Sequence, residues 1–379
     1  MAGDKRSVVV TGMGVVTPYG AGVDRFWSGL TGDQCAIRRS PRFSLAGEPA
    51  LGAPMPGAVV DEIKTRAGGR SCEWAMERML AEALSGAGLD EADLRSIGRG
   101  AVFFSNHFDG DAHEDMTAGR EWRVDRWCAW LQDRLGAPEG GCVLTGCTAS
   151  NMAIGLGFEW IADGFSDWAV VGGMDLLHDE LLVEFESLRM LSQTGCRPFA
   201  ADHDGTILGD GAGLLLLESA ERAEARRARA LAYVVGHGVA SDVTGMGKLD
   251  PEGSAVRGAM ERAIASAGLR PSDVDFVNAG ATGSAAVDDS EGRALASVFG
   301  QPGPAVYSVK PLIGHSIGGA GAVEAIATIL SLRHGVVPIA LAGLQGARPA
   351  GRGRLDTALN NTIAMSGHVC STLFKRVSS

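Results

Sequence analysis

The chain has 379 residues, 45% of them hydrophobic, and a formal net charge of −11 at pH 7. This length allows a large hydrophobic core shared between two parts of ordinary domain size. The acidic balance argues against nucleic acid as a partner, and the lack of a long apolar run argues against a membrane span. The seven cysteines show no paired CxxC spacing, and the first strand has no signal-peptide core before it, so a cytoplasmic protein is expected.

Apolar runs of strand length alternate with longer helical stretches, and this alternation predicts an α/β fold. The first part is expected to contain strands at residues 8–11, 101–104, 142–145, 168–171 and 213–217 and helices at 72–85 and 150–162. The charged segment 224–229 is interpreted as a connector. The pattern then restarts, with strands expected at 232–236, 274–278 and 305–308 and helices at 254–267 and 318–333. We therefore expect two halves, residues 1–225 and 226–379.

Cys147 lies in Thr-Gly-Cys-Thr-Ala-Ser-Asn (residues 145–151), between the strand expected at 142–145 and the following helix. Amide donors and the positive end of a helix dipole favour a thiolate, which is the form that attacks a carbonyl efficiently. Cys147 is therefore a candidate nucleophile. The alternative is a small buried hydrophobic residue, since free cysteine is among the most buried residue types.

A second segment, residues 308–325, runs from a strand end through small residues into another helix. Together with residues 146–151, it resembles the β-ketoacyl synthase (condensing enzyme) family of the thiolase superfamily. Residues 8–18 are similar to the family's opening strand and turn, and residues 197–213 are similar to its central motif. The resemblance implies a thiolase fold, with two similar βαβαβαββ-type halves in a five-layered αβαβα arrangement.

The same resemblance implies the catalytic residues. Cys147 from the first half would meet His315 and Lys310 from the second. Lys310 would help to organise an acidic pair, Asp288 and Glu291; the alternative is a plain surface lysine. No metal and no cofactor are expected.

One catalytic residue of the family is absent. Elongating members carry Cys-His-His, with the first histidine in Asn-Ala-His-Gly-Thr, whereas residues 278–284 here read Asn-Ala-Gly-Ala-Thr-Gly-Ser and Gly280 occupies the histidine position. Both imidazoles normally donate hydrogen bonds to the malonyl thioester oxygen, and losing one oxyanion donor costs roughly 10² to 10³ in rate. Acyl transfer to Cys147 needs only the thiolate, backbone amides and one imidazole. We therefore expect that acyl transfer is retained and that decarboxylation is impaired.

The family's glycine-rich gating loop near the C-terminus is also altered. Residues 361–369 read Asn-Thr-Ile-Ala-Met-Ser-Gly-His-Val, so Met365 replaces the usual phenylalanine and Gly367 is the loop glycine that remains. Side chains at former glycine positions restrict the backbone, so a stiffer loop is expected. His368 is a new imidazole in this region. It either compensates for Gly280 or is a solvent-facing or core histidine.

Other departures affect the pocket and the partners. Residues 107–140 are shorter and more polar than in the family, and residues 340–343 lack its usual turn. The acidic cluster of His107, Asp109, Asp111, His113, Glu114 and Asp115 has mixed ligands and no metal spacing, so an acidic surface loop is expected. Family members dimerise, and the strand at 168–173 is expected to form the contact. An acidic carrier protein would dock on arginines, for which the candidates are Arg66, Arg70, Arg120, Arg123 and Arg126; a solvated face is the alternative.

Three functions follow. The first is a ketosynthase-like acyltransferase of polyketide biosynthesis, resembling ketosynthase relatives of macrotetrolide pathways. It would take an acyl group from an acyl carrier protein or a coenzyme A thioester onto Cys147 and pass it to a hydroxyl, forming an ester. The second is decarboxylative chain extension, with His315, Lys310 and His368 making up for the missing donor. The third is a non-catalytic partner like a chain-length factor, which shapes a pocket for an active ketosynthase. For the protein in general, a homodimer or a ketosynthase heterodimer is expected.

Overall fold

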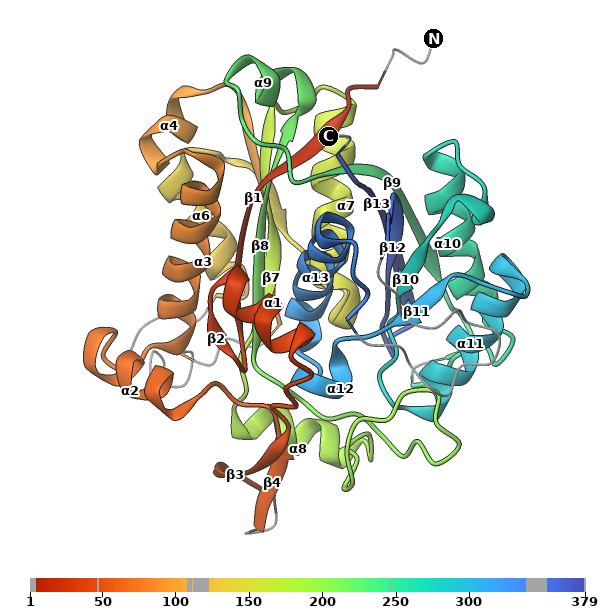
Figure 1. Ribbon diagram of the computed structural model, residues 1–379. Helices are drawn as coiled ribbons and strands as arrows, with labels where there is room; N and C mark the ends of the chain where they lie inside the picture. Colours follow the sequence, from red (N-terminus) through yellow and green to blue (C-terminus); the bar gives the residue numbers. More distant parts are fainter. Residues whose placement is uncertain are drawn as a thin grey trace.

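Two groups of five strands form the framework of the molecule (Figure 1). The computed structural model describes residues 5–45, 48–107, 111, 123–245, 247–338 and 353–377. In spatial order the first group is β6 (Glu139–Cys142), β5 (Gly100–Asn106), β7 (Trp168–Asp175), β8 (Gly211–Ser219) and β1 (Val8–Thr17). The second group continues as β9 (Ala232–Ser241), β13 (His368–Lys375), β12 (Thr357–Ile363), β10 (Phe276–Asn278) and β11 (Ala305–Tyr307).

The two groups share one topology. When the strands of each group are numbered along the chain, both groups have the spatial order 3-2-4-5-1. The last strand of each order, β1 in one group and β9 in the other, lies where the two groups meet. These two strands pair antiparallel, from Val8 opposite Val234 to Val10 opposite Ala232, so the sheets join into one. The prediction of two similar halves is confirmed.

Helices on both sides of each sheet complete five layers (Figure 1). The outer layers are α3 (Ser71–Ala87) with α6 (Arg126–Leu135), and α10 (Ser254–Ser266) with α11 (Ala285–Phe299). The central layer is α7 (Ala149–Ala162) and α13 (Ala320–His334). The predicted thiolase fold is therefore confirmed.

Shorter elements connect these layers. The helices are α1 (Val23–Thr31), α2 (Gly57–Arg66), α4 (Glu91–Ser96), α8 (Asp179–Ser187), α9 (Ala220–Ala225) and α12 (Lys310–Ile313), with 3₁₀ turns η1 (Gly146–Thr148), η2 (Pro271–Asp273) and η3 (Ile317–Gly319). The remaining strands are β2 (Gly20–Ala21) and the hairpin of β3 (Arg38–Leu45) and β4 (Glu48–Gly52). 

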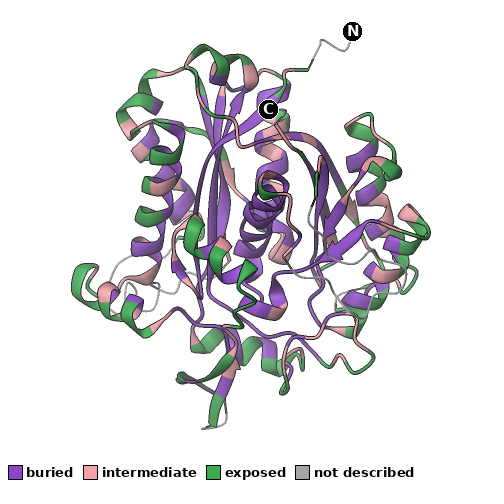
Figure 2. Ribbon diagram, viewed as in Figure 1, coloured by how far each residue is buried: buried purple, intermediate pink, exposed green. Residues whose placement is uncertain are grey.

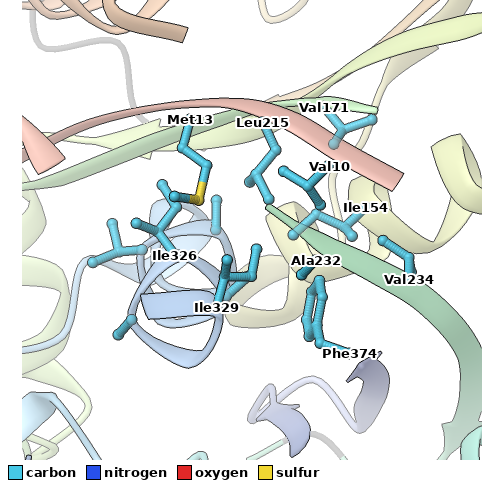
Figure 3. Packing of buried hydrophobic residues seen from close by; sticks show 14 of the residues in the cluster. Val10, Met13, Ile154, Val171, Leu215, Ala232, Val234, Ile326, Ile329 and Phe374 are labelled. Atoms are coloured by element: carbon cyan, nitrogen blue, oxygen red, sulfur yellow. The ribbon is translucent and has the colours of Figure 1, made fainter. Parts of the chain in front are cut away.

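The central helix α13 is buried on every side (Figure 2). All of its residues from Ala320 to Leu332 are buried, as expected for a helix that lies between two sheets and has no solvent-facing stripe. Figure 3 shows the resulting core, in which Val10 and Met13 of β1, Ile154 of α7, Ile326 of α13 and Phe374 of β13 pack together. The two halves therefore share this central cluster of the hydrophobic core.

The strand expected at residues 142–145 is wrong in its position. The strand is Glu139–Cys142, and Leu144 is 47% exposed in the loop after it. The observed strand contains Gly140, where a β-carbon would lie 2.0 Å from the carbonyl oxygen of Val102. Because glycine pairs are depleted in strands, the sequence pattern placed the strand on the apolar residues that follow.

The assignment of the dimer contact to residues 168–173 is also wrong. Residues 168–173 belong to β7, which pairs with β5 on one side and β8 on the other, so its backbone has no free edge. The expectation placed the dimer contact on an interior strand. In the described part of the chain, β6 is the edge strand of the first group of five.

Candidate active site

Cys147 lies in the tight turn η1, directly before the first residue of α7. Gly146 has φ +63°, a left-handed conformation that glycine adopts without strain. The Thr148 hydroxyl closes the turn by donating to the carbonyl oxygen of Thr145 at 2.9 Å. The turn therefore holds Cys147 at the N-terminus of a helix, as the motif predicted.

The resting form of Cys147 is the thiol. The residue keeps some solvent-accessible surface, but it lies deep enough among protein atoms that burial raises the pKa of its thiol to about 12. The nearby Lys310 ammonium opposes this shift, and the Asp175 carboxylate adds to it. Desolvation therefore outweighs the favourable position at the helix end. A base has to remove the proton.

His315 is a buried imidazole beside the short helix α12. Its backbone is fixed by a bond to the carbonyl oxygen of Ile207 at 2.7 Å and by one from the N–H of Gly209 at 3.0 Å. Neither ring nitrogen has a hydrogen-bond partner among the residues that the structure describes. Burial, and then the charge of Lys310, lowers the pKa of His315 well below its usual value, so the imidazole is neutral at pH 7.

Lys310 is 2% exposed, which excludes a plain surface lysine. Its ammonium forms an ion pair with Glu324 of α13, which is 1% exposed. Burial raises the pKa of Glu324, and Lys310 opposes that shift. Lys310 was expected to organise Asp288 and Glu291, but its ion pair is with Glu324. Glu324 lies one turn into α13, and this position brings its carboxylate within reach of the Lys310 ammonium.

The two central helices bring the cysteine turn and the histidine segment together. The Ala322 N–H of α13 donates to the hydroxyl of Ser150 in α7 at 2.9 Å. A β-carbon at Gly321 would lie 2.6 Å from the Asn151 nitrogen, so the helices approach at a distance that only glycine allows. As a result η1, which contains Cys147, contacts η3, which begins two residues after His315.

Glu291 and Asp288 hold backbone amides of the segment in which the family histidine is missing. Glu291 accepts from the N–H groups of Gly280 and Ala281, both at 2.8 Å, and from the side chain of Asn361 at 2.6 Å. Asp288 accepts from the N–H of Gly283 at 3.2 Å. Burial raises the pKa of both carboxyls, and these hydrogen bonds lower it.

The Gly280 position has room for a side chain. A β-carbon there would lie 3.4 and 3.5 Å from the two carboxylate oxygens of Glu291 and 3.6 Å from the carbonyl oxygen of Asn361. These are ordinary contact distances, and Gly280 does not have a left-handed backbone. The missing imidazole is therefore a change of residue and not a collapse of the backbone.

The altered C-terminal loop is a tight hairpin between β12 and β13. A β-carbon at Gly146 would lie 3.6 Å from the Ala364 side chain and 3.7 Å from the Ser366 hydroxyl, so the hairpin lies against the cysteine turn. Gly367 has φ +90°, and a β-carbon on it would lie 2.3 Å from the carbonyl oxygen of Asp242. Met365 is partly buried against the core of the second half.

His368 is half-buried at the first position of β13. Alternation along the strand places it on the same face as Cys370 and Thr372. Those two side chains contact His237, whose ring packs on Gly155 of α7. His368 thus lies on the sheet face that α7 covers, and its role as a substitute for the missing histidine stays a prediction.

Three residues that sequence reasoning did not assign also belong to this region. Asp175, at the end of β7, accepts from the Gly318 N–H at 2.7 Å, next to η3. His203, within the central motif, lies 3.2 Å from Asp288. Glu324 is the third, and one signal could have found it, because a lone carboxylate in an apolar helix requires a buried partner.

The acidic cluster was expected to be a surface loop, but Asp111, the one carboxylate of the cluster that the structure describes, is buried. Asp111 is 2% exposed, and it accepts from the N–H groups of Ser71, Cys72 and Glu73 at the start of α3, at 2.9 to 3.3 Å. A carboxylate is stabilised at a helix N-terminus, which explains its burial. Asp109, His113, Glu114 and Asp115, as well as residues 340–343, lie outside the described residues. In the parts of the chain that can be described, no group of three metal-ligating side chains comes together.

The predicted docking arginines are spread over α2, α3 and α6. Arg66 ends α2 and lies 3.6 Å from Glu62. Arg123 pairs with Asp125 at 2.7 Å, and the guanidinium of Arg126 lies 4.5 Å from the centre of the Trp127 ring. Arg70 pairs with Glu73, and Arg120 lies outside the described residues. Their role in carrier binding stays a prediction. Across the described helices, none is long and apolar enough to cross a membrane.

Comparison with known proteins gives consistent results. The 3-oxoacyl-[acyl-carrier-protein] synthase 2 of Mycobacterium tuberculosis is 38% identical over 251 residues, which cover 62% of this chain and 60% of that protein. The enzyme of the same name from Staphylococcus aureus N315 is 29% identical over 416 aligned positions and 99% of both chains. Among solved structures, the ishigamide ketosynthase/chain length factor has a TM-score of 0.84 at 26% identity, over 99% of this chain and 100% of that one. A β-ketoacyl synthase from Burkholderia phymatum has a TM-score of 0.84 at 27% identity, over 98% and 100%.

Family models match most of the chain. The model of the β-ketoacyl synthase N-terminal domain matches residues 5–120 and 140–223, and the model of the C-terminal domain matches residues 231–343. The chain belongs to the β-ketoacyl synthase family.

Proposed function

We propose that this protein is an acyltransferase of polyketide biosynthesis that forms an acyl thioester on Cys147 and transfers the acyl group to a hydroxyl. The observation that carries this proposal is the contact between the turn that contains Cys147 and the turn that follows His315, together with Gly280 at the position of the family's first histidine. The residues for acyl transfer to cysteine are kept, whereas decarboxylation loses one of its two imidazoles. Ester formation needs only the residues that are kept.

Loading of Cys147 begins with proton removal. His315, neutral and without a described partner on either ring nitrogen, accepts the proton of the thiol, whose pKa is raised to about 12. The thiolate attacks the carbonyl carbon of the incoming acyl thioester. The carbon–sulfur bond to the carrier then breaks, and the carrier thiolate takes the proton from His315. The products are acyl-Cys147 and a free carrier thiol.

Transfer repeats the same steps with an alcohol. His315 takes the proton of the acceptor hydroxyl, and the oxygen attacks the acyl carbon on Cys147. The bond to the cysteine sulfur breaks, and the thiolate regains a proton from His315. Because the Lys310 charge destabilises the imidazolium, the proton passes on quickly. No decarboxylation is required.

Apolar side chains beside Cys147 suit an acyl chain. Cys147 packs against a buried cluster that includes Leu177, Leu181, Phe185 and Ile317. Leu177 lies in the connection after β7, and Leu181 and Phe185 lie on α8. We infer that this cluster borders the acyl group once it is on the cysteine.

Decarboxylative chain extension is the second candidate. It is supported by the names of the relatives and by His368, which lies on the α7 face of β13. Gly280 weakens it, because glycine offers no side-chain donor to the enolate oxygen.

A partner chain is also proposed. The exposed side chains of Val124 (40%) and Leu144 (47%) lie beside the end of β6, which is an edge strand among the described residues, and strand edges invite pairing. A homodimer or a heterodimer with a related chain would cover this edge. One structural relative is named as a ketosynthase/chain length factor, which supports the heterodimer. The third candidate, a non-catalytic partner, is disfavoured because Cys147 is present.

The test is the intact mass of the protein after incubation with a panel of acyl thioesters, on carrier protein and on coenzyme A. We expect an adduct on the native chain and none on Cys147→Ala. Addition of hydroxyl acceptors or of malonyl thioester to the isolated acyl-enzyme then separates ester formation from condensation. Absence of any adduct, together with co-purification of a related subunit, would favour the non-catalytic partner.

A further inference from the structure

Two loops from opposite halves of the chain are joined next to Gly280. The first is residues 196–205, and the second is residues 280–284 with the first turn of α11, which contains Asp288. Four contacts connect them, namely Cys196 Sγ to Thr282 O (3.6 Å), Phe199 N to Asp288 Oδ2 (2.9 Å), His203 Nδ1 to Asp288 Oδ2 (3.2 Å) and Gly205 N to Gly283 O (3.0 Å). The segment that lost the family histidine is therefore held by this junction and by Glu291.

Asp288 is the buried charge at the centre of the junction. Its side chain is fully buried, and in the described part of the chain its one partner that can become a cation is His203. Its other contacts are the N–H groups of Phe199 and Gly283. Burial of an ionised carboxylate is unfavourable unless the charge is paired. The state of Asp288 therefore depends on the proton of His203.

The remaining charges nearby do not replace His203. On the same loop, Arg197 pairs with Asp202 at 3.2 Å and lies 3.8 Å from Asp204. Glu291, one turn after Asp288 in α11, adds a negative charge on the other side, and Cys196 lies close enough to feel the Asp288 charge. Among the residues that the structure describes, no second cation forms an ion pair with Asp288.

We propose that His203 is a positioning residue: its protonated imidazole pairs with Asp288 and holds the turn at residues 280–284, and loss of the proton loosens that turn. Histidine is the side chain whose ordinary titration falls between pH 5 and 8, whereas an arginine at this place would pair permanently. The 14% exposure of the His203 side chain leaves a path for exchange of the proton with solvent. The consequence for activity rests on the proposed function, since an acyl acceptor that reaches Cys147 past Gly280 meets an ordered turn only while His203 is charged.

Hydrogen–deuterium exchange of the peptide that contains residues 280–284 tests the proposal directly. The exchange rate, corrected for its intrinsic pH dependence, is followed from about pH 5.5 to about pH 8.5 in the native protein, His203→Arg and His203→Gln. We expect protection to fall as pH rises in the native protein and to stay constant in His203→Arg. In His203→Gln, exchange at the lower pH should be faster by roughly tenfold or more, as for a weakened buried pair. His334→Gln, at the far end of α13, is the control and should follow the native profile.

Identical pH profiles for the native protein and His203→Arg would overturn the proposal, as would unchanged protection in His203→Gln. The matching activity measurement uses acyl-enzyme prepared in advance and records only the transfer to acceptor. In the native protein, the transfer rate should fall as pH rises over the same range in which protection falls. In His203→Arg this fall should be absent. If Cys147 takes no acyl group at all, the proposed function fails, whereas the exchange experiment still decides the role of His203.

Discussion

At the scale of single residues, Lys310 influences both reacting groups. Its charge lowers the pKa of His315 and partly offsets the burial that raises the pKa of Cys147. The thiol and the neutral imidazole are therefore the resting forms. On the proposed mechanism, the reaction would start with a proton transfer between them.

This arrangement predicts the pH dependence of loading. Because the thiol pKa is raised to about 12, the thiolate fraction without a base grows about tenfold per pH unit between about pH 7 and about pH 9. His315→Gln should therefore load more slowly than the native chain, by roughly 10² to 10⁴, and its rate should rise steeply with pH. The measurement is the initial rate of adduct formation at three pH values, with Cys147→Ala as the blank. A shallow profile in His315→Gln would show that another group takes the proton.

A second prediction concerns Gly280. Its backbone tolerates a side chain, so Gly280→His should fold and restore a donor near the enolate oxygen. Decarboxylation of a malonyl thioester should rise by roughly 10² to 10³. The matched control is Gly280→Ala, which adds the β-carbon without a donor and should give no gain. The account of the defect is wrong if saturating malonyl thioester yields equal rates for both variants and the native protein.

At the scale of elements, the site depends on the close approach of α7 and α13. Small residues at the start of each helix let the two N-termini meet, and Asn151 extends the junction to β12 by donating to the Asn360 carbonyl at 3.2 Å. The approach is a matter of packing volume, and it can be tested without catalysis.

Gly321→Ala should strain this junction, because its β-carbon would lie 2.6 Å from the Asn151 nitrogen. Overpacking of this kind lowers the free energy of unfolding by roughly 1 to 3 kcal/mol. Gly86→Ala is the matched control: Gly86 is an exposed position of α3 with no atom within 4 Å of the added carbon, and alanine there should stabilise by roughly 0.5 to 1 kcal/mol. Chemical denaturation of the three proteins gives both values, and equal stabilities would remove the packing argument.

At the scale of the whole molecule, polar groups are buried in the core between the sheets. His237 on β9 is 6% exposed, and its ring lies against α7, 3.3 Å from the Thr372 hydroxyl. Burial lowers its pKa from 6.5 to about 4. The folded protein therefore binds this proton more weakly than the unfolded chain does.

The sign of the pH effect follows from that difference. Above about pH 6.5 both states are neutral and the stability is fully present; as pH falls towards about 4, the unfolded state gains the proton first and stability is lost, by up to about 3 kcal/mol. His237→Gln removes this contribution. Unfolding free energies of the native protein and His237→Gln, measured across this range, should differ in slope, because shifts of the buried carboxyls are common to both. Parallel curves would contradict the prediction.

Much of the fold and part of the site were determined by the sequence alone. The alternation of apolar runs placed most strands and helices, since buried strands and amphipathic helices have local periods. The cysteine turn was placed by local motif as well, because it depends on a glycine and a helix start that are neighbours in the chain. The boundary between residues 225 and 226 stays a prediction.

Tertiary structure alone decided which distant groups meet. Lys310 pairs with Glu324, Asp288 contacts His203, and Asp111 caps α3, although each pair is separated by many residues or lies on another element. The protonation of Cys147 was likewise set by burial and by Lys310, which no local pattern contains. The physical reason is that periodicity and motifs report interactions along the chain, whereas desolvation and charge pairing depend on which elements pack together in space.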